Sequence, residues 1–137
     1  MVVNYIDLEL AFEFASAGVA GEDAAYLDRE SGQILFVSDA SEDEIPEDIL
    51  HNERYLSIPN KKEFDLGKPL VLKFSEEFLP DDMDAIYLMF KKRGAYSAFK
   101  YFLASKKQLD NWHQYERSAV KETIVQWCAD NGVALNL

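Results

Sequence analysis

The stretch that decides the fold reads RGAYSAFK over residues 93–100, and the run WHQY follows it at residues 112–115. Apolar side chains recur every three or four residues through both segments, which predicts amphipathic helices. Gly94 follows a run of cations, a pattern typical of a helix C-terminus, so one helix is expected to end there and another to begin. The last helix is expected from about Leu109 to Asn131. This half of the chain therefore predicts packed helices with aromatic side chains between them.

The segment just upstream shows the same helical spacing. Pro69 suits the first turn of a helix, and Leu70, Phe74 and Phe78 recur at four-residue intervals. Pro80 ends this helix and can begin the next one. Aspartates follow Pro80 directly, where the positive N-terminal end of the helix dipole favours acidic side chains. The sequence from about residue 67 to 131 is therefore expected to be helical throughout.

The N-terminal part carries strand signals. Residues 24–28 and 33–38 are apolar and flank a polar turn that contains Gly32, which predicts a β-hairpin. Residues 55–58 predict a third strand that Pro59 stops, and Pro46 is expected to begin a short helix over residues 46–51. Residues 4–17 fit two patterns, because their apolar side chains alternate as in a strand and also recur at helical spacing. We favour a helix there, with Gly18 as its end.

These elements together predict an α+β fold. A small three-stranded antiparallel sheet, a meander, is expected to pack against about five helices, with the C-terminal half helical. A length of 137 residues suits a single domain over residues 1–137. Within it, residues 1–60 form an acidic part with one helix and the β-meander, and residues 61–137 form a helical part.

Charge is distributed unevenly along the chain. The net charge is −11, yet residues 1–60 hold fourteen Asp and Glu against two Arg, whereas residues 61–137 are nearly balanced. Such an acidic chain repels nucleic-acid phosphates at long range. Cys128 is the single cysteine, so no intrachain disulfide can form. With no signal-peptide pattern and no long apolar run, we expect a cytoplasmic protein that does not enter a membrane.

Several short motifs resemble those of a known family. The segment YLDRESG at residues 26–32 is similar to the hairpin of the bacterial uncharacterised protein family 0158, and YLSIP at residues 55–59 is similar to its short strand. Further landmarks of its helical half are matched by Phe74, Gly94-Ala95, Phe99, Trp112, Trp127 and Gly132. The resemblance implies an N-terminal helix, a small antiparallel sheet and a helical C-terminal half. It implies no reaction, cofactor or catalytic residue, and it favours the helical interpretation of residues 4–17.

No motif with recognisable chemistry stands out. The histidines His51 and His113 are far apart in the sequence, so they do not show the convergent spacing of a metal site. Cys128 beside Trp127 fits a buried thiol better than a nucleophile. The glycines of residues 18–21 lack the lysine and hydroxyl of a phosphate-binding loop. We therefore predict no metal, no cofactor and no catalytic residue, and lean toward a protein that is not an enzyme.

The best candidate for a binding surface is a basic cluster, formed by Lys91, Lys92, Arg93, Lys100, Lys106 and Lys107. Cations at helix ends also complement helix dipoles, which explains most of them without a partner. We expect a non-enzymatic protein-interaction module that uses its acidic N-terminal surface and residues 91–107. Its partner is an unknown protein, or a second copy whose acidic N-terminal half pairs with this basic cluster. The alternatives are a nucleic-acid-associated protein that uses residues 91–107, since cations among aromatics can follow a phosphate backbone, and an enzyme assembled from Asp28, Arg54, His113, Tyr115 and Glu116.

Overall fold

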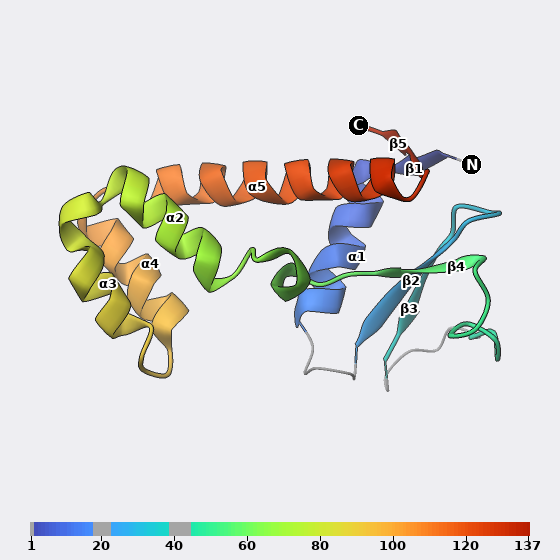
Figure 1. The fold of residues 1–137 in the computed structure, drawn as a ribbon, viewed down its shortest axis with the longest axis horizontal. Helices are drawn as coiled ribbons and strands as arrows, with labels where there is room; N and C mark the ends of the chain where they lie inside the picture. Colours follow the sequence, from blue (N-terminus) through green and yellow to red (C-terminus); the bar gives the residue numbers. More distant parts are fainter. Residues whose placement is uncertain (1, 18–22, 39–44) are drawn as a thin grey trace. The chain divides into compact units, whose positions relative to one another are not determined.

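The computed structural model describes residues 2–17, 23–38 and 45–137 (Figure 1). The chain forms two compact units. The first unit comprises Met1–Phe64 and Lys121–Leu137, and the second comprises Asp65–Val120. The long helix α5, Leu109–Asp130, contributes its beginning to the second unit and its end to the first. The C-terminal segment therefore belongs to the first unit, together with the N-terminal residues.

The first unit contains the predicted three-stranded antiparallel sheet, formed by β2 (Ala24–Asp28), β3 (Ile34–Val37) and β4 (Tyr55–Ile58). The strand order is β3-β2-β4, with Ala25 paired to Phe36 on one side and to Ile58 on the other. The antiparallel sheet is thus confirmed, but the order is not that of a meander, because the first strand of the hairpin lies in the middle. A central position lets Ala25 and Leu27 become fully buried.

Residues Tyr5–Ala17 form the helix α1, which confirms the favoured interpretation of this segment. The helix contacts all three strands of the sheet (Figure 1). Leu8, Ala11 and Phe12 are buried, a spacing of three and four residues that brings them to one side of a helix. A strand would instead have buried every second residue, so sheet packing decides between the two patterns. The predicted end at Gly18 lies outside the described residues.

A two-stranded parallel sheet joins the two ends of the chain, and the sequence did not predict it. It pairs β1 (Val2–Asn4) with β5 (Ala134–Asn136), with Val3 opposite Leu135 (Figure 1). Strands of three residues carry too little periodicity to be recognised, and their pairing depends on residues more than 130 positions apart. Val3 is buried at 3% exposure, so the pairing closes one end of the first unit.

The second unit is helical, as predicted. It consists of α2 (Lys68–Phe78), α3 (Met83–Met89), α4 (Ala95–Ser105) and the beginning of α5, with a short 3₁₀ helix η2 (Pro80–Asp82) before α3. Its centre is aromatic: the Trp112 ring lies 5.3 Å from the Phe74 ring and 5.4 Å from the Phe99 ring. All three side chains are buried, which confirms the predicted role of these residues as core.

The helix predicted at residues 46–51 is wrong. Residues 47–51 form hydrogen-bonded turns, in which the His51 and Asn52 amides both donate to the Asp48 carbonyl. So few hydrogen bonds do not offset the entropy cost of starting a helix, and the segment leads directly into β4. A second 3₁₀ helix, η1 (Lys61–Phe64), follows that strand.

Replacing Gly94 with alanine is expected to destabilise the protein by about 1–2 kcal/mol, because Gly94 begins α4 with φ of +72°. A Cβ atom there would meet no heavy atom within 4 Å, so the loss comes from backbone strain and not from a clash. Gly94→Asn is expected to cost less, since asparagine tolerates the left-handed region. Urea unfolding of the three proteins measures this, and equal midpoints for Gly94→Ala and the parent would contradict the assigned backbone conformation.

Candidate functional site

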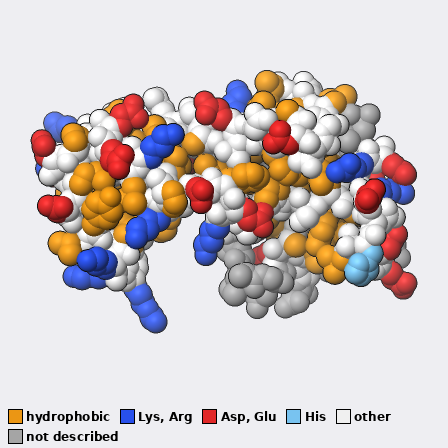
Figure 2. All heavy atoms as spheres, in the orientation of Figure 1, with side chains coloured by type: hydrophobic (Ala, Val, Ile, Leu, Met, Phe, Trp, Pro, Cys, Tyr) orange, Lys and Arg blue, Asp and Glu red, His pale blue; other side chains and the backbone are white. Residues whose placement is uncertain are grey.

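The predicted basic cluster lies entirely in the second unit, and its six side chains are all exposed. Lys91, Lys92 and Arg93 form the turn between α3 and α4, Lys100 lies in the middle of α4, and Lys106 and Lys107 follow its end. Figure 2 shows Lys and Arg side chains projecting at the end of this unit where α3 meets α4. The structure therefore places these cations along one helix and its two ends.

Helix ends account for most of this charge. Lys91 and Lys92 follow the C-terminus of α3, and Lys106 and Lys107 follow that of α4, where the helix dipole favours cations. Lys106 also lies 3.7 Å from a carboxylate oxygen of Asp82. Lys100 is different, because it lies in the middle of α4, where the helix dipole does not favour a cation. Among the described residues it forms no ion pair.

Two tyrosines accompany these cations on α4. Tyr101 is 82% exposed, whereas Tyr96 is 47% exposed and its ring contacts the Phe90 ring at 5.3 Å. Tyr96 and Lys100 are four residues apart and therefore neighbours on one helix face. We call Lys91, Lys92, Arg93, Lys100 and Tyr101 the basic–aromatic surface. Tyr101 directly follows Lys100 in the sequence, and only the structure shows that its ring is left in solvent.

Asp28 and Arg54, predicted as parts of an assembled active site, form an ion pair in the first unit. Two atoms of the Arg54 guanidinium, Nε and Nη2, each lie 2.8 Å from a carboxylate oxygen of Asp28. Asp28 is 5% exposed and also accepts a hydrogen bond from the Glu30 amide at 2.9 Å. The bidentate contact holds the pKa of Asp28 well below its usual range, although burial alone would raise it.

The contacts of this ion pair are those of a structural clamp. Arg54 reaches Glu30 as well, at 3.0 Å, and its backbone carbonyl accepts a hydrogen bond from the Arg29 amide. The pair therefore fastens the segment before β4 to the turn of the β2–β3 hairpin. A carboxylate whose two oxygens are both bound to a guanidinium is poorly placed to take a proton from a substrate.

The other three residues of the enzyme hypothesis lie on α5 in the second unit, and all are half-buried. Tyr115 packs its ring against Phe74 at 5.3 Å and against Phe78 at 6.2 Å. These contacts make Tyr115 part of the aromatic core. Asp28 and Arg54 belong to the first unit, so the structure does not assign the five residues to one unit.

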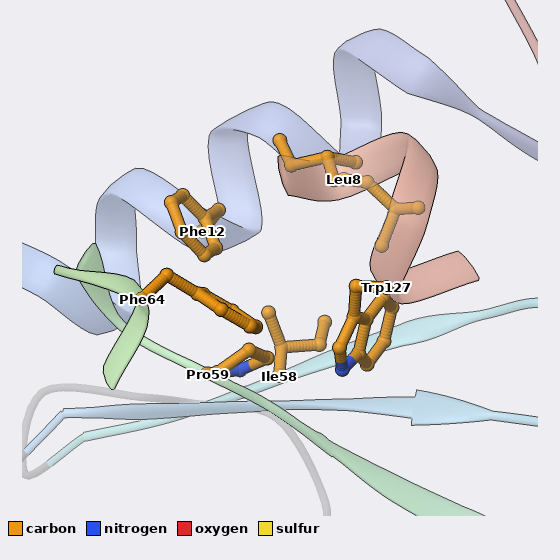
Figure 3. Close-up of a pocket in the computed structure, with 7 residues that line it drawn as sticks. Leu8, Phe12, Ile58, Pro59, Phe64 and Trp127 are labelled. Atoms are coloured by element: carbon orange, nitrogen blue, oxygen red, sulfur yellow. The ribbon is translucent and has the colours of Figure 1, made fainter. Parts of the chain in front are cut away.

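A small pocket lies in the first unit and is apolar (Figure 3). Its volume is about 10 Å³, which is room for about one water molecule. It lies between α1, the end of β4, η1 and the end of α5, and its lining side chains are Leu8, Phe12, Ile58, Pro59, Phe64, Ile124 and Trp127. Since drug-sized ligands occupy pockets of about 300–1,000 Å³, this space is too small to hold one.

Cys128 is buried at 2% exposure, and burial raises the pKa of its thiol. A thiol that stays protonated is a poor nucleophile, which agrees with the predicted core position. Within residues 2–17, 23–38 and 45–137, no group of three or more His, Cys, Asp and Glu side chains is placed to hold a metal ion. No described helix is both long and apolar enough to cross a bilayer.

The sequence did not predict a second exposed surface, on α1. Ile6 and Leu10 are 68% and 60% exposed, and Asp7 between them is also exposed. We call Ile6, Asp7 and Leu10 the α1 ridge. The signal was present in the alternating pattern of residues 4–17, which contains more apolar side chains than one helix face can bury. These two aliphatic residues are the surplus.

Comparison with known proteins agrees with the family resemblance of the sequence motifs. The model of the uncharacterised protein family UPF0158 matches residues 2–136, nearly the whole chain. Searches of curated proteins and of solved structures gave no match. The matched range covers both compact units, including the two terminal strands that close the first one. The chain therefore belongs to the uncharacterised protein family UPF0158.

Proposed function

We propose that this protein is a non-enzymatic protein-interaction module that uses the basic–aromatic surface of α4 to bind an acidic surface of a protein. The observation that carries the proposal is Tyr101, whose ring is 82% exposed next to the mid-helix cation Lys100. Tyrosine and arginine are enriched at protein interfaces, where an aromatic ring supplies contact area and cations select an acidic partner. Neither core packing nor the helix dipole explains these two side chains.

The overall charge favours a protein over a nucleic acid as the partner. The second unit holds nine Lys and Arg against eight Asp and Glu, so it is nearly neutral, and the whole chain is at −11. Binding to nucleic acid depends on many cations that replace condensed counterions. A protein contact requires fewer charges, because apolar and aromatic area contributes most of its free energy.

The test compares three forms of the full chain as bait in a lysate of the source cells. The control is Lys73→Glu, which changes an exposed lysine on α2. We expect the parent and this control to capture the same protein from the lysate, and we expect the double variant K100E/Y101A not to capture it. An equal set of captured proteins for all three baits would contradict the proposal. Fluorescence titration with single- and double-stranded oligonucleotides at low salt tests the alternative, and micromolar binding that K100E/Y101A abolishes would replace our proposal with nucleic-acid binding.

A further inference from the structure

We infer that the acidic surface bound by the basic–aromatic surface is the α1 ridge of a second copy of this chain. This inference rests on the proposed function and names its partner. The α1 ridge belongs to the first unit and is aliphatic and acidic. The basic–aromatic surface belongs to the second unit and is aromatic and basic. The two surfaces are therefore complementary in charge.

The α1 ridge has the character of a contact surface. Ile6 and Leu10 are four residues apart, so they lie one turn apart on the same face of α1. Both are more than half exposed, and aliphatic side chains grouped in this way on a soluble protein often mark a binding site. Asp7 is three residues before Leu10, so it lies next to Leu10 on the surface of the helix.

Asp7 is also available to a cation from outside. Two other acids of α1 are already engaged, since Glu9 accepts the Tyr5 hydroxyl at 2.8 Å and Glu13 pairs with Lys61 at 2.9 Å. Among the described residues, Asp7 accepts a hydrogen bond from the Asn4 side-chain amide at 3.5 Å, the limit of a hydrogen bond. The described residues therefore compensate its charge only weakly.

Charge complementarity selects the second copy. The first unit, which carries α1, holds seventeen Asp and Glu against five Lys and Arg, whereas the second unit carries a slight excess of cations. At moderate salt, this asymmetry attracts the second unit of one molecule to the first unit of another. In contact, Lys100 would face Asp7, and the Tyr101 ring would cover Ile6 and Leu10.

The experiment is sedimentation of the full chain over a concentration series reaching about 1 mM, in about 0.1 M and about 1 M salt. We expect self-association at the lower salt concentration, and we expect the higher one to weaken it. Asp7→Lys makes position 7 basic like position 100, and Lys100→Glu makes position 100 acidic like position 7. Each variant alone is therefore expected to associate at least about tenfold more weakly than the parent. The controls Glu122→Lys and Lys73→Glu make the same charge changes at exposed positions on α5 and α2, and are expected to behave as the parent.

Mixing the two variants provides the sharpest test. The basic ridge of Asp7→Lys is then opposite the acidic α4 of Lys100→Glu, and the remaining pair of surfaces keeps its original charges, so the mixture is expected to associate again. A parent that stays monomeric at low salt, variants that associate like the parent, or a mixture that does not associate would each overturn the inference. A monomeric parent leaves the proposed function standing if K100E/Y101A still loses a captured protein. Equal capture by all baits removes the proposed function itself.

Discussion

Replacing Trp112 with alanine is expected to lower the free energy of unfolding by about 3–5 kcal/mol, the range for large aromatic residues removed from a core. The side chain is 2% exposed and contacts the Phe74 and Phe99 rings edge-on, so alanine leaves a cavity lined by two aromatic rings. Edge-to-face contacts of this kind add to the area that each ring buries. Urea unfolding followed by circular dichroism measures the loss.

Two further variants make this prediction specific. Tyr101→Ala removes an aromatic ring of similar chemistry that is 82% exposed, and it is expected to change stability by no more than about 0.5 kcal/mol. Trp112→Phe keeps an aromatic ring and is expected to fall between the alanine variant and the parent, which provides a measurement if Trp112→Ala does not fold. Similar losses at positions 112 and 101 would contradict the assignment of Trp112 to the core.

Replacing Asp28 with asparagine is expected to cost about 1–3 kcal/mol at neutral pH, because it removes the charge that Arg54 binds through two hydrogen bonds of 2.8 Å. Asp28 is buried, so water does not replace the lost interaction. Glu30→Gln is the matched control. Glu30 binds the same guanidinium but its side chain is 70% exposed, so its loss is expected to stay within about 0.5 kcal/mol.

The contribution of Asp28 depends on pH with a definite sign. The ion pair lowers the pKa of Asp28 in the folded state. As the pH falls below ~3.9, Asp28 therefore binds a proton in the unfolded chain before it does so in the folded protein. Stability from this group is therefore fully present above about pH 4 and is lost as the pH falls toward the folded pKa. Urea unfolding from pH 7 down to about pH 3 is expected to show the gap between the parent and Asp28→Asn narrowing below about pH 4. A gap that widens in acid would contradict the ion pair.

Local pattern predicted the helices and the hairpin because their signals lie within a few residues of one another. The spacing of Leu70, Phe74 and Phe78 indicated α2, and Gly94 marked the start of α4 with a positive φ. The β2–β3 hairpin followed from a turn glycine between apolar runs. The short helix expected at residues 46–51 is absent. Its prediction depended on one proline, which is a weak signal when few helical hydrogen bonds can follow.

The candidate site was predicted only in part. The six cations were named from the sequence, but the sequence could not separate those that complete a helix end from Lys100, which does not. The observed bounds of α4 made that distinction, because Lys100 lies in the middle of the helix. Exposure then singled out Tyr101, which is left in solvent while Phe99 on the same helix is fully buried. The α1 ridge was not predicted, since an alternating apolar pattern does not say which residues a neighbouring sheet will cover.

The sequence by itself determined where the helices and the central strands form, and that the chain is acidic at one end and balanced at the other. The tertiary structure alone decided the pairing of β1 with β5, the central place of β2, and the contact between Asp28 and Arg54, which are 26 residues apart. Helix and turn signals are local, because their hydrogen bonds join residues three or four positions apart. Strand order, ion pairs and the exposure of a given ring depend on which distant segments pack together, and local periodicity does not specify that.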